Sequence, residues 1–126
     1  MYKRQGKSVV TFRIPFKARI EEAPTITVSQ PATVGITTVD VLYKFAQGDP
    51  RVSTAWTSFY TAGQEANIDV GGFCSDIAAD RAHAVSLATP STLLLRSDQV
   101  RFDITGIGTG AKGLKATVYY AREYNG

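Results

Sequence analysis

Hydrophobic and polar residues alternate along most of the chain, which is the pattern of β-strands with one buried face. The alternation is most regular over residues 38–45, where Val39, Val41, Tyr43 and Phe45 share one face. Alternation, or enrichment in β-branched and aromatic residues, predicts further strands over 12–20, 25–29, 53–61, 92–96, 100–105 and 114–121. With a short apolar segment at 85–87, about seven or eight strands are predicted.

Helical character is confined to one short segment. Residues 75–81 follow the strand-breaking pair Gly71-Gly72, and Ser75 is placed to cap a helix with Asp76 in its first turn. We expect either a short helix or an irregular loop there. Short strands separated by turns, with at most one short helix, predict an all-β fold, an antiparallel β-sandwich or a small barrel. No repeat of fixed period is visible, which argues against a propeller or a solenoid.

The segment 12–20 combines an apolar face with a cationic one. Phe12, Ile14, Phe16, Ala18 and Ile20 alternate with Thr11, Arg13, Pro15, Lys17 and Arg19. Pro15 cannot donate a backbone hydrogen bond, so we expect this strand at a sheet edge or at a bulge. Outward cations on an edge strand discourage unwanted pairing, and they also suit docking to a partner. Both interpretations stay open.

Positive charge is concentrated at the start of the chain. The first twenty residues contain six of the fourteen Lys and Arg residues and none of the eleven Asp and Glu residues. The six are Lys3, Arg4, Lys7, Arg13, Lys17 and Arg19. Such asymmetry is typical of a contact surface. We therefore interpret residues 1–10 as a basic N-terminal arm, residues 11–126 as a single β-sandwich domain, and the six cations as candidate partner-binding residues.

Composition excludes several classes of site. Cys74 is the only cysteine and His83 the only histidine, so neither an internal disulfide nor the usual Cys and His ligand set of a zinc site can form. The longest run of large aliphatic residues, 93–95, is far shorter than the roughly 20 residues of a membrane-spanning helix. The basic start is not followed by the apolar segment of a cleaved secretion signal. We expect no metal, no cofactor and no membrane contact.

A glycine motif near the end of the chain lacks the context of a nucleotide site. Gly108, Gly110 and Gly113 have the spacing of a dinucleotide-binding loop, but alternating strand residues follow them instead of a helix. We interpret residues 106–113 as the tip of a hairpin that joins the strands predicted on either side.

Two pairs of reactive side chains also fall short of a site. Cys74 and His83 have no recognisable third group that would orient a nucleophile and its base. Asp76 and Asp80 are spaced one helical turn apart, but two carboxylates are too few for a dedicated calcium site. We therefore expect the protein not to be an enzyme.

Aromatic residues gather in two segments of the chain. Within a strand, Trp56 and Tyr60 would share one face while Phe59 would point to the other. One face would then lie in the core and the other in a subunit contact, although exposed Trp and Tyr also stack on sugars or on single-stranded bases. The candidate interface aromatics are Trp56, Phe59, Tyr60, Tyr119 and Tyr124.

Three late blocks of sequence carry a resemblance to a known family. They are Ser-Asp-Gln-Val-Arg-Phe-Asp-Ile-Thr-Gly at 97–106, Gly-Thr-Gly at 108–110 and Leu-Lys-Ala-Thr-Val-Tyr-Tyr-Ala at 114–121. In this pattern roughly the last two-thirds of the chain resembles the small jelly-roll head-decoration, or cement, proteins of tailed bacteriophages. The resemblance implies a jelly-roll-like sandwich and a non-enzymatic protein, made in the host cytoplasm, that sits on the outer capsid surface. It also implies a homo-oligomer, a dimer or trimer, that reinforces contacts between major capsid subunits.

Two other functions stay open beside capsid decoration. A tail, baseplate or receptor-binding sandwich of the same virion would bind glycan through its outer aromatics. A nucleic-acid-binding module would place the six cations on phosphates. Residues 21–126 are net acidic, however, with eight bases against eleven acids, and the aromatics are not interleaved with the cations, which argues against nucleic acid. On charge alone, we expect the cations to meet an acidic surface of the major capsid protein.

Overall fold

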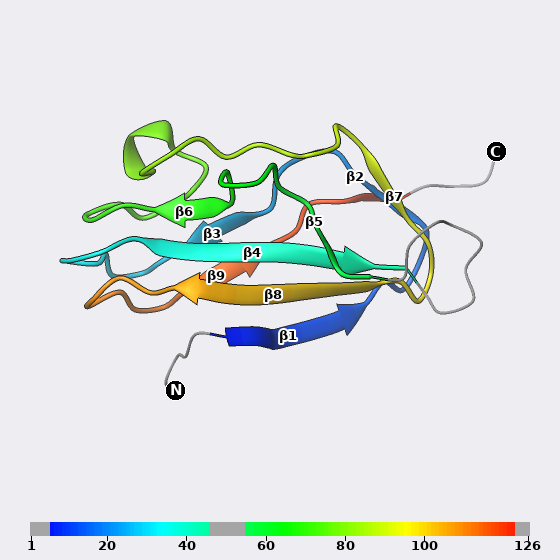
Figure 1. The fold of residues 1–126 in the computed structure, drawn as a ribbon, viewed down its shortest axis with the longest axis horizontal. Coiled ribbons are helices and arrows are strands. Elements are labelled where there is room, and N and C mark those ends of the chain that lie inside the picture. Colours follow the sequence, from blue (N-terminus) through cyan, green and yellow to red (C-terminus); the bar gives the residue numbers. More distant parts are fainter. Residues whose placement is uncertain (1–5, 46–54, 123–126) are drawn as a thin grey trace.

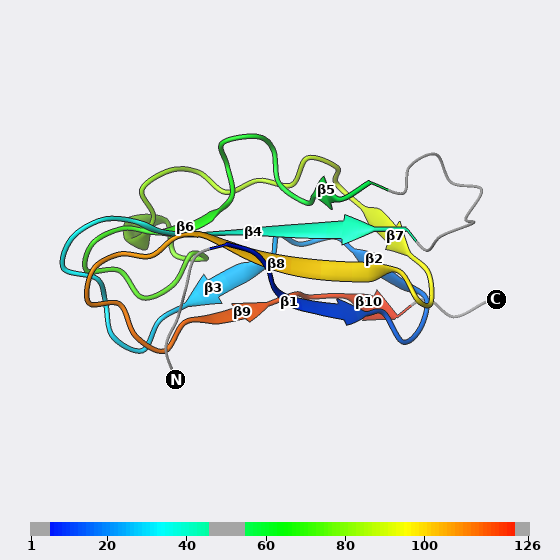
Figure 2. The same ribbon diagram turned by 60° about the horizontal axis from the view of Figure 1, so that its bottom comes forward.

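The computed structural model describes residues 6–45 and 55–122, with side chains from Val10 onward. Over these residues the chain forms ten short strands and one 3-10 turn, arranged in two layers (Figures 1 and 2). The elements are β1 (Gly6–Arg13), β2 (Ala18–Ile20), β3 (Thr25–Thr27), β4 (Thr37–Lys44), β5 (Thr57–Ser58), β6 (Ala66–Ile68), η1 (Ala78–Asp80), β7 (Thr92–Leu94), β8 (Gln99–Gly106), β9 (Lys115–Thr117) and β10 (Ala121–Arg122). The predicted all-β sandwich is confirmed.

The first layer is an antiparallel sheet with the strand order β1-β8-β4-β5, and β6 also pairs with β4. Its centre is the long pairing of β4 with β8, in which Val41 lies opposite Phe102 and Val39 opposite Ile104. This register puts the odd positions of β4 and the even positions of β8 on the inner face, where Val39 and Val41 are buried. The strand predicted over 38–45 is thereby confirmed, with its buried face as expected.

The second layer consists of two short sheets that continue one another. In one, the strand order is β10-β2-β7, and in the other β3 pairs with β9. Because β3 follows β2 and β10 follows β9, one interrupted pair of strands runs through the layer, with Arg19 opposite Ala121 and Ile26 opposite Ala116. Ile20 and Ile26 point into the core from this pair and are completely buried.

Strands that are neighbours in a sheet are mostly not consecutive in the chain. The chain passes from β1 to the second layer at β2 and β3, returns at β4 to β6, crosses at β7, returns at β8 and crosses again at β9. Such alternation between two antiparallel sheets is the Greek-key arrangement of a jelly roll. Among the described strands, the first layer has one more row than the second, so this part of the sandwich is open on the side of β1 and β10.

The prediction of a single strand over 12–20 is wrong. β1 ends at Arg13, β2 begins at Ala18, and the two strands belong to different layers. Pro15 lies in the turn between them, where its missing N–H costs no ladder hydrogen bond. β1 is an edge strand, as Pro15 and the cations suggested, but it begins at Gly6 and therefore includes half of the segment interpreted as an arm.

The glycine-rich segment is also not the tip of a hairpin. β8 pairs with β1 and β4, whereas β9 pairs with β3, so residues 107–114 cross from one layer to the other. The crossing segment forms bridges to an earlier loop, with Thr109 opposite Val34 and Lys112 opposite Gln30. Gly108 packs so closely on Gly35 that an added Cβ would lie 2.8 Å from the Gly35 carbonyl oxygen. The element that follows the glycines is the strand β9, as the alternation over 114–121 predicted.

Two other local predictions need correction. Within the described part of the predicted strand 53–61, only β5 is a strand, and Phe59 and Tyr60 are both buried, so neither faces the predicted subunit contact. The short helical segment is the single turn η1, whose N-cap is Ile77, not Ser75. The Ser75 hydroxyl instead accepts a hydrogen bond from the backbone N–H of Ile26, 2.9 Å away, inside the core.

Candidate interaction surface

The predicted cations do not form one continuous strip. Arg13 is exposed at the end of β1, where its Nη1 donates to the Ser97 carbonyl oxygen at 3.1 Å. Lys17 is half-buried in the turn that leads to β2. Arg19 lies in β2, between β10 and β7, and its Nη1 donates to Ser91 Oγ at 3.2 Å. Protection of a sheet edge can therefore explain Arg13 but not Arg19, because β2 is paired on both sides.

The remaining predicted cations lie mostly outside the described structure. Lys3 and Arg4 precede the described residues, as Tyr124 follows them. Lys7 is in β1, where only its backbone is described. The interpretation of residues 1–5 as a docking arm therefore stays a prediction from charge.

The open side of the sandwich exposes apolar side chains on the inner face of β1. Val10 pairs with Phe102 and Phe12 with Val100, so both β1 residues point toward the space between the layers. Val100 is completely buried, yet Val10 is 51% exposed and Phe12 is 37% exposed. The difference arises because no described strand of the second layer covers β1.

A hollow of about 270 Å³ occupies part of this open side. It is lined by Phe12, Arg13, Ile14, Pro15, Phe16, Ala18 and Tyr120. The rings of Phe16 and Tyr120 lie 5.4 Å apart, and the Arg122 guanidinium sits 4.5 Å above the Phe16 ring. The hollow therefore has an apolar floor with cations on its rim. Exposed apolar surface rimmed by polar groups is typical of sites that bind a partner protein.

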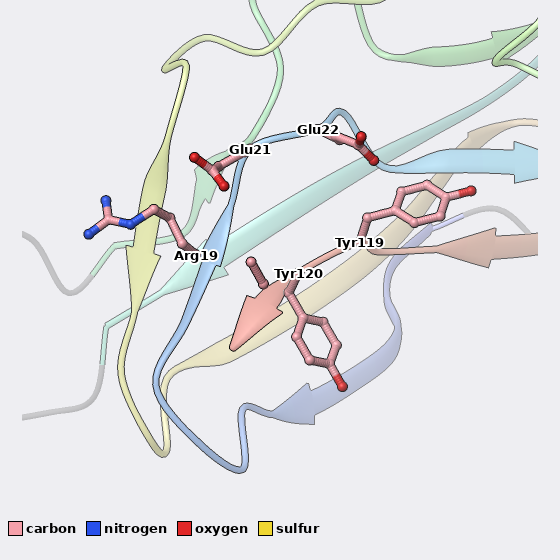
Figure 3. A pocket seen from close by; sticks show the side chains of 6 residues that line it. Arg19, Glu21, Glu22, Tyr119 and Tyr120 are labelled. Atoms are coloured by element: carbon pink, nitrogen blue, oxygen red, sulfur yellow. The ribbon is translucent and has the colours of Figure 1, made fainter. Parts of the chain in front are cut away.

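Two neighbouring tyrosines flank this site on the β10 side. Figure 3 shows that Tyr120 extends toward β1, while Tyr119 points away over the start of β3. The Tyr119 hydroxyl lies 3.1 Å from Thr25 Oγ1, which fixes the ring although it remains 43% exposed. A second hollow, of about 220 Å³, lies between them and is lined by Arg19, Glu21, Glu22, Tyr119, Tyr120 and Ala121 (Figure 3). Tyr119 thus has the exposure expected of an interface aromatic.

The aromatics of the other segment are placed differently from the prediction. Phe59 is 2% exposed and Tyr60 is 3% exposed, and the Tyr60 hydroxyl donates to the Pro24 carbonyl oxygen at 2.8 Å in the core. Burial leaves neither side chain accessible to a partner, so both are core residues. Trp56 is half-buried against the outer face of the first sheet.

Under Trp56 lies a polar cluster that the sequence did not reveal. Arg101 and Asp103 form an ion pair, with Nη2 and Oδ2 2.9 Å apart, and their side chains are only 10% and 8% exposed. The Trp56 ring covers the Arg101 guanidinium at 4.5 Å, and Arg101 Nε has no hydrogen-bond partner among the described residues. A hollow of about 500 Å³ beside the pair is lined by Asp40, Leu42, Trp56, Arg101, Asp103, Ile104 and Thr105.

Asp40 lies beside this cluster, and its carboxyl has a raised pKa. Partial burial raises the pKa of its carboxyl, the hydrogen bond from Ser58 Oγ opposes the shift, and the Glu65 and Asp103 carboxylates add to it. Asp40 and Asp103 are direct cross-strand neighbours, which explains the repulsion. The hollow therefore combines an aromatic ring, carboxylates and a hydroxyl.

The reactive side chains considered from the sequence serve structural contacts. Asp80 Oδ2 accepts hydrogen bonds from the backbone N–H groups of Phe73 and Cys74, at 2.9 and 3.3 Å. The His83 ring contacts Asn67 Nδ2 at 3.1 Å. Among the described residues, no three His, Cys, Asp or Glu side chains are placed to hold a metal ion.

The described part of the chain contains no helix that is long and apolar enough to span a bilayer. A comparison with protein-family models found no match, and comparisons with curated proteins and with solved structures found no significant match either.

Proposed function

We propose that the chain is a non-enzymatic structural protein of a virion, a decoration protein that binds the outer surface of the major capsid shell and stabilises it. The observation that carries this proposal is the open side of the sandwich, where apolar side chains and cations lie together on an uncovered edge. Large exposed apolar patches with a polar rim are typical of surfaces that bind other proteins.

Charge gives the expected character of the partner. Arg13 and Arg122 border the hollow, and the sequence places further cations before β1. An acidic capsid surface would complement them, and attachment would weaken as salt rises, because exposed charges are screened over about 10 Å at 0.1 M salt. We further propose that the chain forms a dimer or trimer and binds the capsid in that form. Sedimentation of the purified protein would measure its oligomeric state.

The test of this function is direct. Purified chain is mixed with undecorated phage heads from the genome that encodes it, the heads are pelleted, and bound copies are counted. Saturation at a fixed number of copies per head supports the proposal, and absence of the chain from the pellet at low salt contradicts it. A variant with Lys3→Gln and Arg4→Gln tests the arm without removing any residue of β1.

Glycan binding is the second candidate, because the 500 Å³ hollow joins Trp56 to the carboxylates of Asp40 and Asp103. Such groups suit sugar rings and hydroxyls. The candidate is weakened by the Arg101 guanidinium, which already covers the Trp56 ring. A glycan array that shows binding lost in Trp56→Ala, without stoichiometric binding to heads, would favour this function over decoration.

A further inference from the structure

Within residues 6–45 and 55–122, no strand pairs with the outer side of the edge formed by β9 and β10. Among the described strands, β9 pairs with β3 and β10 pairs with β2, and neither has a second neighbour. Every residue of both strands is exposed. From Lys115 to Arg122 the edge spans both strands, three residues in β9 and two in β10 with a short break between them, and it leaves room for one more strand alongside.

A strand added at this edge would also cover the apolar floor of the open side. Val10 and Phe12 point from β1 into the space between the layers, and Tyr120 extends toward β1 from the opposite layer (Figure 3). Alternate side chains of an added strand point inward. They would therefore fill the hollow between Phe12, Phe16 and Tyr120.

The charges around the edge indicate which kind of added strand would bind there. Lys115 and Arg122 lie on the edge itself, and Arg13 lines the hollow beside Phe12, where no carboxylate is among the described lining residues. Glu21 and Glu22 line the second hollow, next to Tyr119 and Tyr120, together with Arg19. If a second copy paired with this edge, its cations would lie opposite the cations of the first copy, and the repulsion between like charges would be unfavourable. An extended segment that carries carboxylates would pair with them instead.

We propose that an extended, acidic segment of a partner protein adds as a strand to the β9–β10 edge and buries apolar side chains against Val10, Phe12 and Tyr120. This mode combines backbone hydrogen bonds for affinity with side-chain pockets for specificity. The inference rests on the proposed function for the identity of the partner as a capsid protein, but the edge, the floor and the charges are independent of it.

A peptide probe tests the edge directly. The full chain is titrated into a fluorescein-labelled peptide of alternating valine and glutamate, about ten residues long, and anisotropy is measured at low salt. We expect at least about tenfold tighter binding than for the peptide with lysine in place of glutamate. A glutamate peptide with N-methylated backbone amides, which cannot join a sheet, is expected to lose binding. Equal binding of the glutamate and lysine peptides, or binding that survives N-methylation, would overturn the inference.

Substitutions locate the site. Val10→Asp is expected to weaken binding of the glutamate peptide about tenfold or more. Val70→Asp makes the same change at a similarly exposed residue outside the open side, since Val10 is 51% and Val70 50% exposed, and should bind like the wild type. Tyr120→Asp is a second variant if Val10→Asp fails to fold. Equal affinity of the Val10 and Val70 variants overturns the inference, as does a wild-type dimer that Val10→Asp dissociates, because the edge would then belong to a second copy.

The same variants separate this inference from the proposed function. If heads bind the wild type and Val10→Asp equally, the chain is a decoration protein that uses another surface. If heads bind neither but the glutamate peptide discriminates between Val10→Asp and Val70→Asp, the edge accepts a strand and the capsid is not its source.

Discussion

Removal of the Asp103 carboxylate should destabilise the protein strongly, although Asp103 lies on an alternating strand whose polar face would ordinarily be exposed. The Asp103 and Arg101 side chains are only 8% and 10% exposed and are joined at 2.9 Å. Asp103→Ala would leave the guanidinium beneath Trp56 without its counter-charge, and breaking a buried pair in this way costs about 3–5 kcal/mol. Removing the Asp103 carboxylate also relieves its repulsion of Asp40, which offsets part of this cost. We therefore expect the free energy of unfolding to fall by about 2–4 kcal/mol.

The loss is measurable by urea unfolding and by thermal melting followed by circular dichroism. For a domain of this size, about 2–4 kcal/mol corresponds to a fall in melting temperature of roughly 6–15 °C. Asp76→Ala, which removes an exposed carboxylate, is the matched control and should change stability by less than about 0.5 kcal/mol. Replacing both partners, with Arg101→Met and Asp103→Leu, should recover most of the loss. Equal stability of the Asp103 and Asp76 variants would refute the description of the pair as buried.

Three further predictions concern the fold. Gly108→Ala should lower the free energy of unfolding in urea by about 1–3 kcal/mol, because the new Cβ would overlap Ala32 Cβ and lie 2.8 Å from the Gly35 carbonyl oxygen; an unchanged midpoint would contradict this packing. Asp40→Asn should raise the melting temperature near neutral pH. The pKa of this carboxyl is raised on folding, so the stability linked to its protonated form is lost as pH rises through the folded pKa, and the gain should shrink in acid. Tyr60→Phe should cost about 1 kcal/mol, because the Pro24 carbonyl oxygen loses its buried donor; no loss would show that water replaces the hydroxyl.

The sequence was most informative where one strand has one buried face. Over 38–45 the alternation of Val39, Val41 and Tyr43 predicted both the strand and its inner face, because β4 is paired with β8 from Thr38 to Lys44. Over 12–20 the same alternation continued although the chain passes there from β1 in one layer to β2 in the other. A turn of four residues, Ile14 to Lys17, preserves the parity of the pattern, so periodicity alone could not reveal it.

The functional features depend on contacts between distant segments. Arg101 and Asp103 look like the solvent side of a strand, and only the covering Trp56, far away in the chain, buries them. The glycines at 106–113 suit a hairpin as well as a crossing, and pairing of β9 with β3 decides between the two. The open side was foreseen only in part: Pro15 and Arg13 indicated an edge strand, but the missing row over Val10 and Phe12 is visible only in the folded chain.

Attachment to the capsid through the open side is tested most directly by counting bound copies per head for three proteins in parallel. Wild-type chain and Val70→Asp are predicted to saturate undecorated heads at the same fixed number of copies. Val10→Asp is predicted to remain in the supernatant at concentrations where the other two are bound. Failure of the wild type to bind would contradict the decoration function, and equal binding of all three would contradict docking at the open side.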